Sequence, residues 1–222
     1  MAQDTPTKVI RIVVVDDHPL VREGLSALIH KQPHMTLCGE AEDAPAALRL
    51  IGEVRPDVAL VDITLKDGNG LDLIKNIRTR YPDVRVLVSS MHDEDLFAER
   101  ALHAGALGYV HKQQGIGKLI EAIERVLEGG IYLSEGSSQR LLARYAKAGD
   151  RSTASPLAAL SDREVQVFEF LGQGLGTREI AQKLHLSPKT VERYRENIKH
   201  KLGLPNAHEL IRHATRYVLE MG

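Results

Sequence analysis

Short apolar runs alternate with helical patterns five times in roughly the first 130 residues of this 222-residue chain. Runs such as Ile12 to Val15 and Val58 to Val61 are continuously apolar, as are parallel strands covered by helices on both faces. The alternation therefore predicts a doubly wound α/β sheet. The expected strands are residues 10–16, 35–41, 57–62, 84–89 and 107–110. The expected helices are residues 19–31, 43–54, 70–80, 93–104 and 115–129.

Polar side chains lie at the carboxyl ends of four of these strands. Asp16 ends the first strand and Asp17 follows it, Asp62 ends the third, Ser90 directly follows the fourth, and Lys112 lies two residues after the fifth. In a flavodoxin-like strand order, 2-1-3-4-5, the first and third strands are neighbours about 4.8 Å apart, so the three acids would converge. Because like charges that close repel each other, a hard divalent cation such as Mg²⁺ is expected among them.

This constellation suits phosphoryl transfer to a carboxylate. Asp62 would be the nucleophile, while the metal and Lys112 would neutralise the transferring group and Ser90 would donate a hydrogen bond to it. Each residue alone is better explained as a helix cap or a solvated charge than as part of a site. Their joint placement at the ends of different strands favours a site.

Composition excludes several classes of protein. No apolar stretch reaches the roughly 18 residues that a membrane span needs, and residues 1–8 lack the apolar centre of a secretion signal. The single cysteine, Cys38, cannot form an internal disulfide, which fits a reducing cytosol. We therefore expect a cytoplasmic protein without a membrane partner, with Cys38 as a small packed side chain rather than a redox switch.

The remainder of the chain is helical in pattern and differs in charge. Residues 1–131 carry 15 Lys/Arg and 20 Asp/Glu, whereas residues 156–222 carry 10 and 8. A helical segment, 134–148, and a polar linker, 149–156, precede four expected helices at residues 161–172, 177–184, 188–202 and 207–219. We expect three parts: an α/β domain at 1–131, a linker at 132–155, and a four-helix domain at 156–222.

The segment from Thr177 to Leu202 predicts a helix, a tight turn and a second helix. Thr177 is expected to cap the first helix, His185 and Leu186 to form the turn, and Ser187 to cap the second helix. A 100° rotation per residue places one stripe of the second helix toward the core, namely Val191, Tyr194, Ile198 and Leu202. The opposite stripe is polar and comprises Lys189, Arg193, Glu196 and His200, flanked by Glu192 and Asn197.

Such a helix can enter the major groove of double-stranded DNA, where arginine reads guanine and acids accept from cytosine. Expected base-edge contacts are Lys189, Glu192, Arg193, Glu196 and Asn197. Expected phosphate contacts, which position without specifying, are Thr177, Arg178, Lys199 and Lys201. The alternative is an ordinary amphipathic helix with a solvated face, because the acidic side chains weaken attraction to phosphate.

The α/β part resembles the receiver domain of two-component response regulators. The matching pieces, within residues 9–130, are Val15-Asp16-Asp17-His18, Leu60-Val61-Asp62, Val88-Ser89-Ser90-Met91 and Gly105 to Lys112. The resemblance implies that a histidine kinase phosphorylates Asp62. It also implies Mg²⁺ held by Asp17, Asp62 and the Thr64 carbonyl, with Asp16 acting directly or through water. Ser90 and Tyr109 match the family's switch residues. Leu65 to Gly68 lack the proline that many receivers have there.

The helical part resembles the LuxR-type helix-turn-helix, and the order of the two parts matches the NarL/FixJ group. The matching pieces are Leu160 to Glu164, Gly174, Glu179-Ile180-Ala181, Leu186-Ser187, Thr190-Val191 and Lys201-Leu202-Gly203. Tyr194 stands where many members have histidine. The resemblance implies a transcription factor whose DNA binding depends on phosphorylation. A two-fold homodimer of the phosphorylated protein would bind paired half-sites.

Two other functions compete with this one. The first is a phosphorylation-independent DNA-binding regulator that uses the receiver for dimerisation, although the complete acidic set argues against it. The second is an enzyme such as a phosphatase, which needs a general acid or a second nucleophile. His18 is the nearest candidate for an acid, and none is convincingly placed, so we do not expect an enzyme.

Overall fold

The computed structural model describes residues 9–147 and 156–221, and these fall into two compact units. Among these residues, one unit comprises 9–91 and 101–133, and the other comprises 92–100, 134–147 and 156–221. Almost all of the expected polar linker lies outside the described residues. Among the helices described, none is long and apolar enough to span a membrane.

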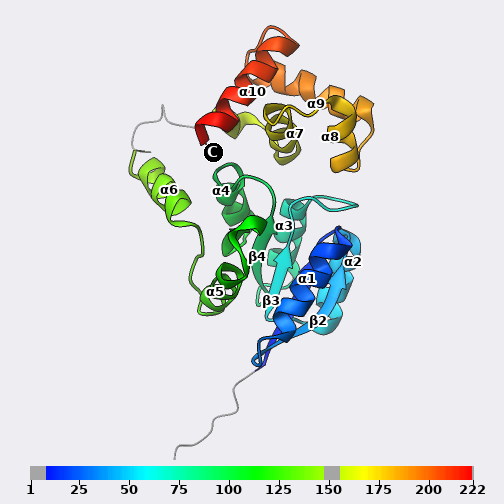
Figure 1. Cartoon of the computed structure of the whole chain (residues 1–222), viewed down its shortest axis with the longest axis vertical. Coiled ribbons are helices and arrows are strands. Elements are labelled where there is room, and N and C mark those ends of the chain that lie inside the picture. The colour runs from blue at the N-terminus through cyan, green and yellow to red at the C-terminus, as the bar shows by residue number, and fades with distance from the viewer. Residues whose placement is uncertain (1–8, 148–155, 222) are drawn as a thin grey trace, which may run out of the picture. The chain divides into compact units, whose positions relative to one another are not determined.

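The first unit contains a five-stranded parallel sheet (Figure 1). Its strand order, β2-β1-β3-β4-β5, confirms the predicted flavodoxin-like order. The strands are β1 (Ile10–Val15), β2 (Met35–Ala41), β3 (Val58–Val61), β4 (Arg85–Ser90) and β5 (Gly108–His111). All four residues of β3 are buried, as expected of a central strand covered on both faces.

Each strand leads into a helix, as the sequence predicted. The helices are α1 (Pro19–His30), α2 (Ala44–Val54), α3 (Gly70–Arg80), α4 (Glu94–Ala104) and α5 (Ile116–Leu127). Pro19 occupies the first turn of α1, where its missing N–H costs nothing. The Asp43 side chain accepts a hydrogen bond from the backbone N–H of Ala46 and so caps α2. Gly129, with φ of 81°, adopts a left-handed conformation just after α5.

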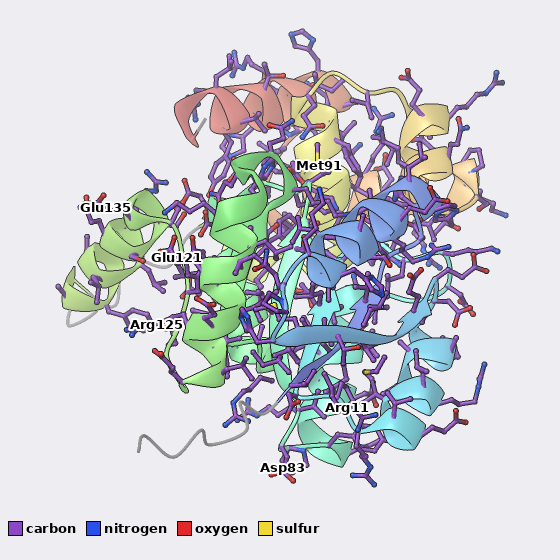
Figure 2. The ribbon with its side chains drawn as sticks, turned by 60° about the horizontal axis from the view of Figure 1, so that its bottom comes forward. Arg11, Asp83, Met91, Glu121, Arg125 and Glu135 are labelled. Atoms are coloured by element: carbon purple, nitrogen blue, oxygen red, sulfur yellow. The ribbon has the colours of Figure 1, made fainter. Side chains whose placement is uncertain are left out.

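Helices α1 and α5 contribute to one apolar cluster against the sheet. Ile29 of α1 and Ile123 of α5 pack in the same cluster as Ile12, Leu60 and Leu87 of the strands. On α5 the exposed side chains Glu121 and Arg125, labelled in Figure 2, alternate with the buried positions at helical spacing. This amphipathic pattern fixes which face of the helix meets the sheet.

The second unit is helical. Besides the 3₁₀ turn η2 (Pro156–Ala159), its helices include α6 (Glu135–Lys147), α7 (Asp162–Gly172), α8 (Thr177–Lys183), α9 (Pro188–Lys201) and α10 (Ala207–Met221). Buried side chains such as Phe168 of α7, Ile180 of α8, Val191 and Ile198 of α9 and Leu210 of α10 supply its core. Of the predicted inward stripe of α9, Val191 and Ile198 are fully buried, and Tyr194 and Leu202 are half-buried.

The predicted cap of α8 is wrong. Gly176, not Thr177, is the N-cap residue, and its backbone N–H donates to the Glu179 carboxylate at 2.7 Å. Thr177 is the first helical residue, and its hydroxyl forms hydrogen bonds with side chains of α9. The predicted turn is present at His185, which adopts a left-handed φ of 53°. Ser187 caps α9 as predicted, since its hydroxyl accepts from the backbone N–H of Thr190 at 3.1 Å.

Cys38 is half-buried on β2, and its thiol donates to the backbone carbonyl of Ile12 at 3.2 Å. Burial raises the pKa of the thiol, which leaves less of the reactive thiolate. The environment therefore suits a packed side chain.

Candidate functional site

The register of β1 and β3 sets the geometry of the acidic site. Val15 pairs with Val61, so the next residue on each strand, Asp16 and Asp62, lies at the same sheet edge. The backbone N–H of Asp62 donates to the carbonyl of Val15 at 2.9 Å, which ties the two strand ends together. Both acids are buried, with 2% of Asp16 and 4% of Asp62 exposed.

Both carboxylate oxygens of Asp62 are held by side chains from other strands. The Ser90 hydroxyl, at the end of β4, donates to Oδ1 at 2.5 Å. The Lys112 ammonium, just after β5, donates to Oδ2 at 2.5 Å. The backbone N–H of Thr64 lies 3.4 Å from Oδ1. The arrangement concentrates a hydroxyl and a cation on one buried carboxylate.

Lys112 also bridges to the neighbouring acid, because its Nζ lies 2.6 Å from Oδ2 of Asp16. Burial would lower the pKa of Lys112, but the nearby charges of Asp62 and Asp16 outweigh burial and raise that pKa. For Asp16, burial and the charge of Asp62 raise the pKa, against the lowering effect of Lys112. The single ammonium therefore does not fully compensate the acids around it.

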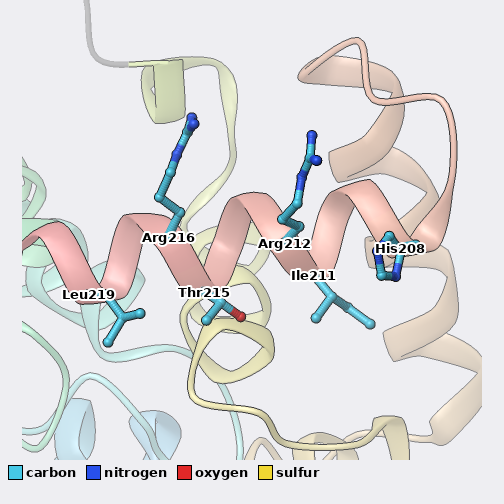
Figure 3. Close-up of a pocket in the computed structure, with 6 residues that line it drawn as sticks. All are labelled: His208, Ile211, Arg212, Thr215, Arg216 and Leu219. Carbon is cyan, nitrogen blue, oxygen red and sulfur yellow. The ribbon is translucent and has the colours of Figure 1, made fainter.

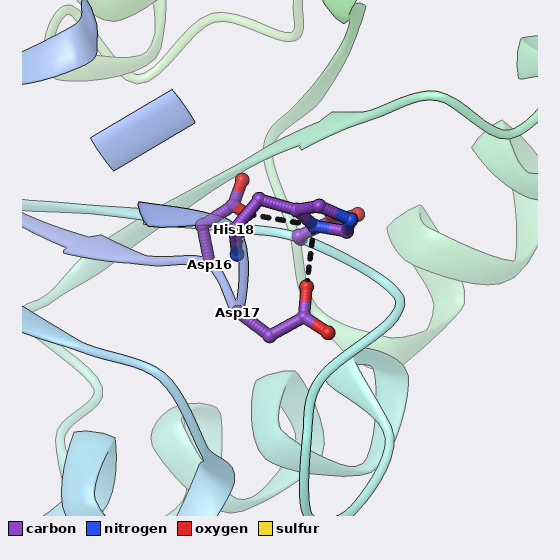
Figure 4. A group of neighbouring side chains, drawn as sticks. Asp16, Asp17 and His18 are labelled. Carbon is purple, nitrogen blue, oxygen red and sulfur yellow. Dashed lines mark hydrogen bonds and ion pairs between the residues drawn. The ribbon is translucent and has the colours of Figure 1, made fainter. Parts of the chain in front are cut away.

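Asp17 and His18 complete the acidic cluster (Figure 4). His18 Nδ1 lies 2.6 Å from Oδ1 of Asp17 and 3.5 Å from Oδ1 of Asp16. One potential ligand atom from each of Asp16, Asp17, His18 and Asp62 lies within 4.8 Å of all the others. Three carboxylates at this spacing fit a hard, oxygen-seeking divalent cation such as Mg²⁺.

The loop after Asp62 lacks the proline that many receivers have, and other contacts order it. Thr64 is buried and forms an isolated bridge with Asn69, whose side chain accepts from the backbone N–H of Leu71 and caps α3. Lys66 forms an ion pair with Glu42, with 2.7 Å between its ammonium and the carboxylate. Gly70 is essential here, because a Cβ atom would lie 2.0 Å from the carbonyl oxygen of Asp62.

Tyr109 lies on β5 opposite Val88 of β4, two residues before the strand-end Ser90. Its side chain is fully buried, with 0% exposed. It therefore belongs to the core of the first unit.

The second candidate surface is the polar stripe of α9. Its exposed members are those that the sequence predicted, namely Lys189, Glu192, Arg193, Glu196, Asn197 and His200. Of the expected phosphate contacts, Arg178 and Lys201 are exposed, whereas Thr177 and Lys199 are half-buried.

Several of these side chains are bound within the unit. Lys201 donates to the buried carboxylate of Glu164 at 2.7 Å, and Lys199 pairs with Glu196 at 2.8 Å. Glu164 also accepts from the backbone N–H of Ser161 and so completes a capping box at the start of α7. The Ser161-x-x-Glu164 spacing was visible in the sequence, but the reach of Lys201 to it across 37 residues was not.

Sequence reasoning missed Arg195. It is half-buried on α9, and its guanidinium contacts both Thr177 and Glu192. Its helical position, between the buried stripe and the exposed stripe, was the available signal.

Helix α10 carries an open hollow of about 490 Å³ on one face (Figure 3). All the lining residues come from this helix: His208, Ile211, Arg212, Thr215, Arg216 and Leu219. Ile211 is 41% exposed and Leu219 is 76% exposed. A hollow lined by a single helix is an open surface rather than an enclosed reaction site.

Two family models match the chain. The response regulator receiver domain matches residues 12–124, and the luxR family of bacterial regulatory proteins matches residues 158–214.

Among the similar proteins are transcriptional and response regulators that align with this chain over most of their length. The transcriptional regulatory protein DegU of Brevibacillus brevis is 33% identical, over 88% of this chain and 88% of that protein. The response regulator GacA of Pseudomonas aeruginosa is 34% identical, over 94% of this chain and 96% of that protein. A structure of RcsB from Salmonella enterica serovar Typhimurium, bound to promoter rprA with a phosphomimetic, has a TM-score of 0.62 at 25% identity. It aligns with 94% of this chain and 99% of that one.

Proposed function

The chain belongs to the two-component response regulators with a LuxR-type DNA-binding domain, and on that premise we propose that Asp62 is its phosphoacceptor. A histidine kinase would supply the phosphoryl group, and phosphorylation would control sequence-specific binding to double-stranded DNA. The convergence of Ser90 and Lys112 on both oxygens of Asp62 carries this proposal.

In the reaction, an Asp62 carboxylate oxygen attacks phosphorus, a new P–O bond forms, and the bond to the donor breaks. Lys112 neutralises negative charge on the transferring group, and the Ser90 hydroxyl donates to one of its oxygens. Both donors already lie within hydrogen-bond distance of Asp62. They therefore need little movement to contact a group attached there.

Asp16, Asp17, Asp62 and the Thr64 carbonyl would hold Mg²⁺. The cation supplies further neutralisation of the phosphoryl oxygens when it is bound. The close spacing of the three carboxylates and the raised pKa of Asp16 support a need for additional positive charge in this cluster.

Ser90 and Tyr109 would couple phosphorylation to the rest of the chain. A phosphoryl oxygen offers the Ser90 hydroxyl a new acceptor beyond Asp62, and movement of β4 at Ser90 reaches its partner strand β5. Tyr109 is fully buried on β5, so a change in packing there requires a discrete rearrangement. Phosphorylation shifts the equilibrium between two arrangements by the difference in its interaction with them.

We place the receiver domain in residues 1–131, the linker in 132–155 and the DNA-binding domain in 156–222. The family matches at 12–124 and 158–214 support these boundaries. DNA contact would come from the exposed stripe of α9, with Arg178 and Thr177 at the start of α8 and Lys199 and Lys201 at the end of α9. The ion pair of Lys201 with Glu164 would compete with its contact to phosphate, and so would the hydrogen bonds of the Thr177 hydroxyl to Glu192 and Arg195.

The phosphorylated protein would bind DNA as a homodimer. The exposed apolar residues of α10, Ile211 and Leu219, offer a surface that a second copy could cover. Another solved structure of the related RcsB is described as two dimers bound to two parallel DNAs, which supports this arrangement. A two-fold dimer would recognise half-sites about one helical turn apart or a multiple of that.

The deciding experiment is intact mass spectrometry after incubation with Mg²⁺ and acetyl phosphate. Wild type should gain one phosphoryl group, about 80 Da from its composition, and Asp62→Asn should gain none. DNA binding of the two proteins is then compared with and without the phosphodonor. Equal gain of mass in the variant would refute Asp62 as the acceptor. A wild-type adduct that leaves DNA binding unchanged would favour the phosphorylation-independent regulator.

A further inference from the structure

Three side chains at the junction of α8 and α9 form a closed hydrogen-bonded group, the Glu192 clamp, made of Thr177, Glu192 and Arg195. The Thr177 hydroxyl donates to Oε1 of Glu192 at 2.5 Å. Nη1 of Arg195 donates to the Thr177 hydroxyl oxygen at 2.6 Å and to the same Oε1 at 3.2 Å. The clamp therefore fixes one oxygen of an exposed glutamate.

The other oxygen of that carboxylate is available. Within the described part of the chain, Oε2 of Glu192 has no hydrogen-bond partner, and the side chain is 53% exposed. Glu192 is the fifth residue of α9, in the N-terminal half of the recognition helix, which is the half that contacts base edges in helix-turn-helix proteins. A fixed acceptor is thus presented where a base would lie.

A carboxylate in the major groove is repelled by the DNA phosphates unless a cation offsets its charge. Arg195 supplies that cation within the clamp, and only 17% of its side chain is exposed. Its guanidinium is committed to Thr177 and Glu192, so it acts as a positioning residue and does not itself read a base.

We propose that Glu192 is a specificity-determining residue that accepts a hydrogen bond from the amino group of a cytosine, with Thr177 and Arg195 positioning it. A carboxylate is an acceptor only. Guanine and thymine present acceptors in the major groove, and adenine places its N7 acceptor beside its amino group. Cytosine alone offers an amino donor without an acceptor on the same base, so the clamp selects C·G at one base pair of each half-site. This inference rests on the proposed DNA-binding function.

The test begins with the full chain, treated with Mg²⁺ and acetyl phosphate and used to select sites from a random DNA library. Binding constants are then measured for duplexes with each of the four base pairs at every position of the selected half-site. The variants are Glu192→Gln, Thr177→Val and Arg195→Met. Asp72→Asn, which removes one negative charge from an exposed position on α3, is the matched control. Thermal melting of each variant reports folding.

Wild type should prefer cytosine at one position by roughly tenfold. Glu192→Gln should lose that preference and gain adenine, because glutamine can pair with both the N6 and N7 positions of adenine. Thr177→Val and Arg195→Met should weaken the preference for cytosine several-fold at that position and leave the other positions unchanged. Asp72→Asn should change the base preference at no position.

If Glu192→Gln keeps the base preferences of wild type at every position of the selected site, the inference is overturned, while the DNA-binding function still stands. Clamp variants that melt at lower temperature but keep wild-type base preferences would also overturn it, since the clamp would then be only a brace between two helices. Failure of wild type to enrich any sequence would instead refute the DNA-binding function and the inference with it.

Discussion

Replacing Lys112 with methionine tests the electrostatic account of the acidic site most directly. The ammonium lies 2.5 Å from Asp62 and 2.6 Å from Asp16, and only 10% of its side chain is exposed. Methionine keeps most of the apolar volume but leaves two buried carboxylates without their shared cation. Removing one partner of a buried pair costs about 3–5 kcal/mol.

The loss should depend on pH in a definite direction. Without the cation, the folded-state pKa of Asp16, already raised by burial and by Asp62, rises further above its unfolded value. A carboxyl with a raised folded-state pKa contributes stability below the unfolded pKa that is lost as pH rises through the folded one. The difference in unfolding free energy between wild type and variant should therefore be largest near pH 8 and shrink toward pH 5.

Urea unfolding measures this difference. With a slope of about 2 kcal/mol per molar, a loss of about 4 kcal/mol moves the midpoint by roughly 2 M. Lys118→Met is the control, because Lys118 is 56% exposed and pairs with exposed Glu121, so it should change stability by less than about 0.5 kcal/mol. Excess Mg²⁺ should restore more stability to Lys112→Met than to wild type. A midpoint within about 0.5 M of wild type, or a loss equal at both pH values, would refute the reasoning.

Two further substitutions test other parts of the structure. Gly70→Ala should lower the unfolding free energy of the receiver, measured in urea, by more than about 3 kcal/mol, because its Cβ would lie 2.0 Å from the carbonyl oxygen of Asp62. It should also reduce the amount of phosphoryl adduct. Wild-type stability of this variant would show that the backbone of Asp62 does not pack closely against residue 70. Glu164→Gln should lower the unfolding free energy of the helical unit by about 1–3 kcal/mol at neutral pH. Although burial would raise the pKa of Glu164, Lys201 and Ser161 lower it overall, so this contribution should disappear as pH falls through that lowered pKa. A difference from wild type that persists in acid would show that charge is not its source.

The sheet and most of the acidic site were predictable because they follow from local rules. Continuous apolar runs identify parallel strands, and in such sheets polar residues at the carboxyl ends meet at one edge. That logic placed Asp16, Asp62, Ser90 and Lys112 at four strand ends without any distance information. In the structure Ser90 and Lys112 contact Asp62, and Lys112 also contacts Asp16.

The contacts that sequence reasoning missed depend on side-chain reach between helices. Thr177 looked like a cap because threonine suits that position, but Gly176 can take the extended cap conformation and Glu179 satisfies its N–H. The freed hydroxyl then meets Arg195, 18 residues away. Helical periodicity gives the face on which Arg195 lies, but not the crossing of α8 and α9 that decides what it touches.

The acidic site and the Glu192 clamp share one chemical arrangement, in which a hydroxyl and a cation hold a carboxylate. Asp62 has Ser90 and Lys112, and Glu192 has Thr177 and Arg195. Their difference lies in burial and in which oxygens are used. Asp62 is 4% exposed with both oxygens held, so its surroundings would stabilise the negative charge of a phosphoryl group attached to it, as the proposed reaction requires. Glu192 is 53% exposed with only one oxygen held, so water and a base can reach the other. A carboxylate, a hydroxyl and a cation would thus serve a covalent reaction at a buried strand end in one proposal and base recognition on an exposed helix in the other.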